Sequence, residues 1–214
     1  MEITETIARK VLEVVDAGLV SGVGNPVPGQ MCVEAAVCYA MGLPHGDEPS
    51  CVSPALRHLK IRLNDCAWSS GRARAKGLRR LAVAQLGSAG VLDDKEFIHR
   101  VIEMASRKIV PIALRAAAVH FKGTEHEDKL LVSALRCERE GTREAVKEAK
   151  KIAAYAAAYA APYADAASAA AYAAIASADA DAQRDRVLTI FADEVVAILV
   201  EMDAPGCQWL PLCA

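Results

Sequence analysis

Ala153-Ala-Tyr-Ala-Ala-Ala-Tyr-Ala-Ala-Pro-Tyr-Ala-Asp-Ala-Ala-Ser-Ala-Ala-Ala-Tyr172 is the stretch that decides the fold class of this chain. Alanine is the best helix former among the amino acids, and it fills most of these positions. Elsewhere apolar residues recur at helical spacing, as Ile7, Val11, Val14 and Val15 do near the N-terminus. The sequence therefore predicts an all-α protein, a single bundle of about seven or eight helices.

A length of 214 residues leaves open one large domain or two small ones, and we expect a single domain over residues 1–214. Within it, a long alanine-rich helix should run over about 142–178, with Thr142 as its N-cap. A last amphipathic helix should follow over about 182–203. The tail 205–214 should then dock on the body of the domain.

The alanine tract carries a regular stripe of aromatic side chains. Tyr155, Tyr159 and Tyr163 recur every four residues, so they share one face of the predicted helix. Alanine on the other faces lets neighbouring helices approach closely. The stripe predicts a packing seam or a surface for self-association into a homo-oligomer, and a base-stacking platform is a weaker alternative. Pro162 should kink the helix near residue 158.

Composition disfavours several classes of partner. The 214 residues include 53% hydrophobic and 5% aromatic residues, and the formal net charge is −2. No basic excess draws the chain to nucleic acid or to an anionic membrane surface. No signal peptide and no apolar run of about 18 residues is recognisable, so we expect no membrane contact and a cytoplasmic location. The seven cysteines should be free thiols, and no motif predicts a cofactor.

Two motifs precede the alanine tract. Met31-Cys32-Val33 opens a short, nearly all-apolar helix, and Asp47-Glu-Pro-Ser-Cys51-Val-Ser53-Pro54 forms the turn after it. With the alanine-rich C-terminal helix, they resemble a family of uncharacterised proteins of bacterial, phage and plasmid genomes. The resemblance runs from about Gly29 to the C-terminus and is specific around 31–54. It implies one structural unit and a role in a mobile element, and it carries over no catalytic residues.

Cys32 is the candidate nucleophile. A thiol in the first turn of a helix feels unpaired N–H groups and the positive end of the helix dipole, which lower its pKa. The order Gly29-Gln30-Met31-Cys32 resembles the helix-start cysteine of papain-like hydrolases, with Gln30 as an oxyanion donor and His45 as the partner base. The Cys-Trp signature of that family is missing. A buried structural thiol is the favoured alternative, since free cysteine is among the most buried residue types.

The same region offers a weaker metal-binding alternative. Cys32, Cys38, His45 and Cys51 could supply a tetrahedral set of sulfur and nitrogen ligands for zinc. None of their spacings is the Cys-x-x-Cys knuckle of structural zinc sites. The sequence therefore favours no metal.

A polar cluster near Cys32 is the first candidate ligand site. Glu34, Asp47 and Ser53 could line a small cleft that recognises a ligand, and Asn64-Asp65 could join it. The alternative is that Asp47 only caps its turn by bonding to the backbone.

The one strongly basic region, 57–80, is the second candidate ligand site. Arg72, Lys76 and Arg79 share a helix face and suit an anionic ligand, whereas Arg80 is uncertain and Arg74 lies well away. Ion pairs with acids of 179–203 explain the same charges without a ligand.

Three functions remain open. We favour a non-enzymatic binding or interaction protein, an accessory factor that sequesters a small anionic ligand or engages a partner protein. The alternatives are a cysteine-dependent hydrolase or transferase using Cys32, and a purely structural, self-associating helical protein.

Overall fold

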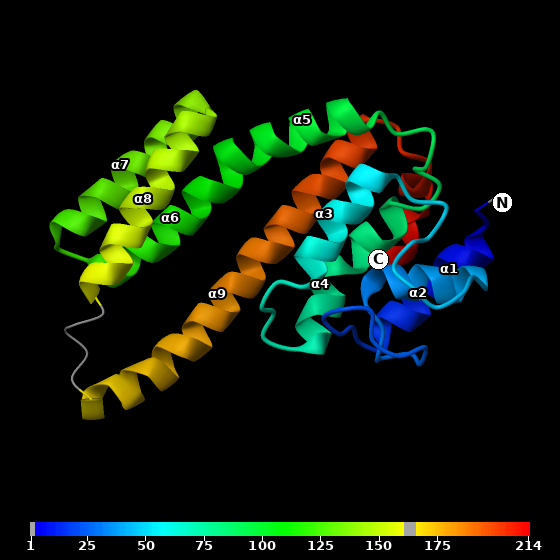
Figure 1. The fold of residues 1–214 in the computed structure, drawn as a ribbon, viewed down its shortest axis with the longest axis horizontal. Helices are drawn as coiled ribbons and strands as arrows, with labels where there is room; N and C mark the ends of the chain where they lie inside the picture. Colours follow the sequence, from blue (N-terminus) through cyan, green and yellow to red (C-terminus); the bar gives the residue numbers. More distant parts are fainter. Residues whose placement is uncertain (1–2, 161–165) are drawn as a thin grey trace. The chain divides into compact units, whose positions relative to one another are not determined.

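Figure 1 shows a computed structural model, whose described backbone covers residues 3–160 and 166–214 and whose described side chains cover 3–155 and 181–214. These residues form α-helices, short 3-10 and π segments, loops, and one isolated antiparallel bridge between Gly24 and Met31. The predicted all-α class is confirmed. Contacts divide the chain into two compact units, described separately here, and the expectation of one domain stays a prediction.

The first unit comprises Met1–Arg100 and Leu188–Ala214. At its centre lies α2 (Val33–Met41), which packs against three other helices and buries seven of its nine residues. A helix surrounded in this way needs apolar residues on every face, which explains its composition. The helices around it are α1 (Glu5–Asp16), α3 (Pro54–Asn64) and α4 (Gly71–Ala84).

Helix starts in this unit follow the sequence signals. Ser53 caps α3, since its side-chain oxygen accepts a hydrogen bond from the Leu56 N–H at 3.3 Å, and Pro54 occupies the first turn. Cys32 is the N-cap of α2, and Gly42 ends that helix in the left-handed conformation at φ 70°. The loop before α2 therefore ends at Cys32, and the loop between α2 and α3 runs from Gly42 to Ser53.

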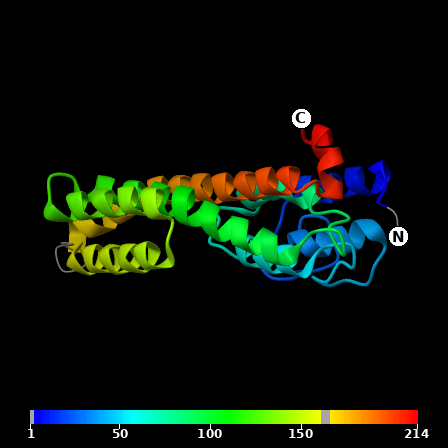
Figure 2. The same cartoon turned by 90° about the horizontal axis from the view of Figure 1, so that it is seen from above.

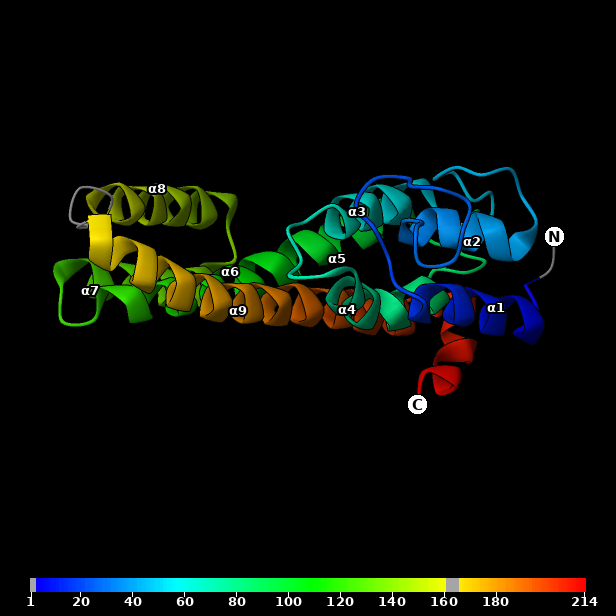
Figure 3. The ribbon, with the colours of Figure 1, turned by 90° about the horizontal axis from the view of Figure 1, so that it is seen from below.

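The C-terminal segment η4 (Pro205–Cys213) packs on α4 and α1, as Figure 3 shows in red. Gly206 lies so close to α4 that a Cβ there would meet the Val83 oxygen at 2.5 Å and the Ala84 oxygen at 2.6 Å. Only glycine lets the two backbones approach this closely.

The second unit, Val101–Val187, has its own core. It contains the end of α5 (Asp94–Met104), then η1 (Ala105–Ile109), α6 (Val110–Ala118), η2 (Val119–Phe121), α7 (Glu125–Glu140) and α8 (Arg143–Ala160). Figure 2 shows α8 alongside α6 and α7, with which it packs. Leu114, Leu130, Ala134, Cys137 and Ala149 form the buried cluster between these helices.

A π-helical segment, η1, joins α5 to α6. Pro111 stands in the first turn of α6, directly after η1, and proline has no backbone N–H with which to continue the hydrogen bonds of the preceding turn. The helical path nonetheless continues from η1 through Pro111 into α6. From η1, Arg107 donates to the carbonyls of Glu138, Arg139 and Glu140 at 2.9–3.2 Å and so caps the C-terminus of α7 with a positive charge.

The C-terminal helices differ from the prediction. Thr142 does cap α8, because it accepts from the Ala145 N–H at 3.2 Å, but α8 ends at Ala160 and α9 runs over Ala166–Glu201. The expected long helix over 142–178 and last helix over 182–203 therefore have the wrong boundaries. No glycine or proline lies between Pro162 and Pro205, so nothing stops a helix near residue 180. Pro162, from which a kink near residue 158 is expected, lies outside the described residues, and α8 is helical up to Ala160.

No helix among the described residues is long and apolar enough to cross a bilayer.

Candidate functional site

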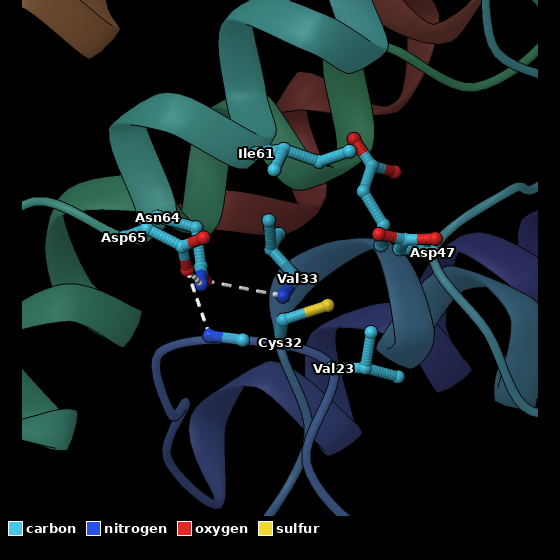
Figure 4. Close-up of a pocket in the computed structure, with 9 residues that line it drawn as sticks. Val23, Cys32, Val33, Asp47, Ile61, Asn64 and Asp65 are labelled. Atoms are coloured by element: carbon cyan, nitrogen blue, oxygen red, sulfur yellow. Dashed lines mark hydrogen bonds between the residues drawn. The ribbon is translucent and has the colours of Figure 1, made fainter.

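A cavity of about 60 Å³ lies beside the N-terminus of α2 in the first unit. Figure 4 shows Ile61 and Asn64 of α3, and Asp65 directly after it, on the wall opposite Cys32 and Val33. The remaining lining residues are Gly22, Val23, Glu34 and Asp47. The sequence predicted that Glu34 and Asp47 could line a cleft with Cys32 and that Asn64-Asp65 could join it. The structure brings all five residues to one cavity.

Asn64 and Asp65 hold the cavity wall together. The Asn64 side chain accepts from the Val33 N–H at 3.3 Å and donates to the Val20 oxygen at 2.9 Å, so it ties α2 to the preceding loop (Figure 4). Asp65 accepts from the Gly22 N–H at 2.8 Å. Burial opposes its ionisation, but hydrogen bonds from Gly22 and two side chains outweigh burial and hold the pKa of its carboxyl below the ordinary value. Both side chains are occupied with loop positioning.

The Cys32 thiol is buried, with 4% of the residue exposed. Its sulfur accepts a hydrogen bond from the Ala35 N–H at 3.3 Å, as an N-cap oxygen would. Burial raises the pKa of the thiol above its ordinary value and outweighs the backbone N–H groups that lower it. The lowered pKa expected of a helix-start nucleophile is therefore wrong, and the structure supports the buried-thiol alternative.

The other two members of the predicted cysteine site point elsewhere. The exposed ring of His45 donates from Nε2 to the Gly24 oxygen at 3.0 Å. Gln30 is exposed, and its side-chain oxygen accepts from Asn25 at 3.3 Å. Neither hydrogen bond prepares a base or an oxyanion donor for Cys32.

The four candidate zinc ligands, Cys32, Cys38, His45 and Cys51, do not gather into one set. No group of three or more His, Cys, Asp or Glu side chains that could hold a metal ion occurs within the part of the chain that the structure describes. All seven cysteines are free thiols.

Ser53 does not reach the cavity. Its backbone N–H donates to the Ser88 hydroxyl at 2.9 Å, and its own hydroxyl donates to Asp94 at 2.5 Å. Because Ser53 also caps α3, its contacts explain a structural role, and its place in the predicted ligand cluster is not supported.

A buried ion pair stands behind the cavity. Lys60 of α3 lies with its Nζ 3.3 Å from Oε1 of Glu34, and both side chains are fully buried. Burial raises the pKa of the Glu34 carboxyl and lowers the pKa of the Lys60 amine, while the charge of each partner pulls the other back toward ionisation. We assign a charged pair at pH 7, because removing either charge would leave the other alone in the core.

Apart from the 3.3 Å ion-pair contact with Lys60, neither carboxylate oxygen of Glu34 accepts a hydrogen bond from a described residue, and Lys60 Nζ likewise has no other partner there. Such orphaned buried acceptors are rare and costly, typically by about 1–3 kcal/mol. Glu34 is one of the residues that line the cavity, and its side chain is fully buried.

The basic residues of α4 make mostly internal contacts. Arg79, predicted as a ligand residue, holds Asp16 of α1 with two hydrogen bonds at 2.7 and 3.2 Å. Arg80 pairs with Asp193 at 2.8 Å, as the ion-pair alternative expects. Arg74 is buried and donates to the oxygens of Asn64 and Leu19. Arg72 and Lys76 are exposed.

Sequence reasoning placed Lys60 in the basic region 57–80 and missed its pairing with Glu34. A signal was present, because Leu56, Lys60 and Leu63 are spaced four and three residues apart and share the buried face of α3. Glu34 is likewise the one acid in a helix that is otherwise apolar or small. Two lone charges of opposite sign on buried faces of consecutive helices predict a buried pair.

Comparison of the chain with protein-family models, with curated proteins and with solved structures finds no match.

Proposed function

We propose that the protein is a non-enzymatic binding protein whose cavity beside α2 takes the ammonium group of a primary amine. The observation that carries this proposal is Glu34: a fully buried carboxylate that lines the cavity and, apart from its contact with Lys60, accepts no hydrogen bond from any described residue. An ammonium group supplies three N–H donors and a positive charge, so it suits such an acceptor.

The charge of the cavity favours a cation. Three carboxyl groups line it, those of Glu34, Asp47 and Asp65, and its lining includes no basic side chain. Lys60 offsets one of these charges from behind. An anionic ligand, which the basic helices suggested, would meet repulsion here.

The size of the cavity sets the class of ligand. About 60 Å³ holds only a few heavy atoms, since one water needs about 10–15 Å³. Whole small-molecule ligands such as nucleotides fill pockets of about 300–1,000 Å³. The cavity therefore suits the tip of an amine, either a small free amine or a lysine side chain of a partner protein.

The cysteine-enzyme alternative has less support. Cys32 lines the same cavity, but burial disfavours the thiolate, and His45 bonds to the Gly24 oxygen. A cytoplasmic location is part of the proposal, because seven unpaired cysteines suit a reducing compartment. A role in a mobile element rests on the resemblance of the two motifs.

The first experiment is a thermal-shift titration of the full chain with methylammonium chloride, putrescine and a lysine-containing peptide, with sodium chloride at equal ionic strength as the control. A ligand that binds the native state raises Tm with its concentration. We expect amines to raise Tm and sodium to leave it unchanged. Small amines that act alone identify a free metabolite, and an effect of the peptide only identifies a partner's lysine.

Asp47→Asn removes one lining charge from a half-buried side chain and should weaken the amine effect several-fold while leaving the fold intact. Glu48→Asn is the matched control, because Glu48 is exposed, pairs with Arg57 and does not line the cavity. The proposal is contradicted if no amine raises the Tm of the wild type. It is also contradicted if the amine-induced rise in Tm is the same in Asp47→Asn and Glu48→Asn.

A further inference from the structure

The outer face of α7 in the second unit carries large apolar side chains in solvent. Val132 is 64% exposed and Leu135 is 59% exposed, although both stand in the middle of the helix. The opposite face of α7 already supplies Leu130, Ala134 and Cys137 to the core of this unit. The exposed pair is therefore surplus to the packing of α7 within its own chain.

Charged residues flank this apolar centre in a particular order. With 100° per residue, Glu125, Asp128, Arg136 and Arg139 all fall within about 40° of Val132 around the helix axis. Both acids lie on the N-terminal side of Val132 and both arginines on its C-terminal side. The rise of 1.5 Å per residue sets the separations along the helix axis. Asp128 and Arg136 are each about 6 Å from Val132 along this axis, and Glu125 and Arg139 are each about 10 Å from it.

The order acid, apolar, basic is self-complementary when a second α7 runs antiparallel. A two-fold axis through Val132 would set Asp128 of each copy opposite Arg136 of the other, and Glu125 opposite Arg139. The apolar residues would meet at the centre, as the fully buried part of an interface requires. A parallel arrangement would instead set like charges side by side.

A hollow beside this face gives the second copy a place to insert side chains. It has a volume of about 280 Å³ and is lined from α7 by Val132 and Ser133 and from α8 by Ile152, among others. A partner's Leu135 is of a size to enter it. A helix pair alone buries less than the roughly 1,200 Å² of standard interfaces, so the hollow adds needed area and the affinity should be modest.

Present ion pairs on the face do not prevent this pairing. Glu125 contacts Lys129, and Arg136 donates to Glu140 at 3.0 Å, one turn along the helix in each case. Exposed pairs of this kind are worth about 0.3–0.5 kcal/mol and exchange readily. Each arginine also keeps further N–H donors for a second carboxylate.

We propose that α7 is the self-association surface of this protein, and that two copies pair antiparallel about Val132 with Asp128–Arg136 and Glu125–Arg139 contacts between chains. This surface lies outside the amine cavity, so the proposal stands independently of the proposed function. It also differs from the alanine-tyrosine seam predicted from the sequence.

The test is sedimentation velocity of the full chain over a concentration series from about 1 to 500 μM. We expect the mass to rise from one chain to two. Asp128→Arg and Arg136→Asp should each raise the dimer dissociation constant at least tenfold, because like charges then face each other twice. Mixing the two variants should restore a heterodimer, since every contact again joins opposite charges.

Arg62→Asp is the control matched to Arg136→Asp, because it makes the same change in net charge at an exposed arginine of α3, and it should leave dimerisation unchanged. Circular dichroism checks that every variant keeps its helix content. A single-chain mass throughout the concentration series overturns the proposal. So does a dimer that tolerates both reversals, or a mixture that fails to pair while each variant stays folded.

Discussion

Replacement of Lys60 by methionine tests the buried ion pair. Lys60→Met keeps the length of the side chain and removes its charge, so Glu34 loses the partner that lies 3.3 Å away. A buried charge without a partner is strongly destabilising, typically by about 3–5 kcal/mol. We expect a loss of this order in the free energy of unfolding at pH 7.

The pH dependence of that loss follows from the same geometry. In Lys60→Met, the native state should keep Glu34 protonated, since burial raises the pKa of its carboxyl above the ordinary 4.5. Taking up that proton costs about 1.4 kcal/mol for each pH unit above the unfolded pKa, so about 3.4 kcal/mol at pH 7 and below about 1 kcal/mol at pH 5. A raised folded pKa gives stability that is present at low pH and lost as the pH rises. The penalty of Lys60→Met should therefore grow from pH 5 to pH 7.

The assay is urea unfolding of wild type and Lys60→Met at pH 5, 6, 7 and 8, with circular dichroism as the measure of the folded fraction. The double variant Glu34→Gln/Lys60→Met is the control. It removes both charges, so its difference from wild type should change much less with pH than that of the single variant. A penalty for Lys60→Met that is the same at every pH would refute a charged Glu34–Lys60 pair.

Three further variants test the site and its surroundings. Cys32→Ser should cost about 1–3 kcal/mol by chemical denaturation, because the thiol is buried and a hydroxyl replaces it in an apolar setting, and fast alkylation of wild-type Cys32 would contradict this burial. Gly206→Ala should cost about 1–3 kcal/mol and loosen η4 in hydrogen exchange, whereas Gly46→Ala, at a glycine with open space, should be nearly neutral. Arg79→Glu should lower the free energy of unfolding by at most about 1 kcal/mol, because its partly exposed pair with Asp16 is screened by solvent. Adding Asp16→Arg should restore the pair with reversed charges and recover the loss. If it does not, Arg79 has a different partner.

Local signals in the sequence mark two helix boundaries of the first unit. Proline after serine marks the start of α3, and glycine after an apolar run marks the end of α2, because these residues act through backbone geometry that needs no distant partner. The grouping of Glu34 and Asp47 around Cys32 was also predicted, since the short loop between α2 and α3 keeps them close.

Other features depend on contacts that sequence spacing does not give. Ser53 does not belong to the predicted cluster, because its hydroxyl donates a hydrogen bond to Asp94, which lies 41 positions away in the chain. Arg79 pairs with Asp16 rather than with an acid of the C-terminal region, because α1 packs on α4. The pKa of Cys32 depends on burial in the assembled core, which outweighs the helix N-terminus that the sequence shows.

Self-association was predicted from Tyr155, Tyr159 and Tyr163. Of these, Tyr155 is 65% exposed and its ring lies 5.6 Å from the His126 ring, whereas the side chains of Tyr159 and Tyr163 lie outside the described residues. The alanine-tyrosine seam stays a prediction. The charge-reversal pair on α7 distinguishes it from the surface proposed above.

The most direct measurement of the central claim is a ¹H–¹⁵N NMR titration of the full chain with methylammonium chloride. If the cavity holds an ammonium group, saturable shifts should appear at the amides of Cys32–Ala35 and of Asn64, and Asp47→Asn should weaken them several-fold. Sodium chloride at the same ionic strength should leave these amides in place. Shifts that are absent, spread over the whole chain, or equally large with sodium would contradict an amine-binding cavity at Glu34.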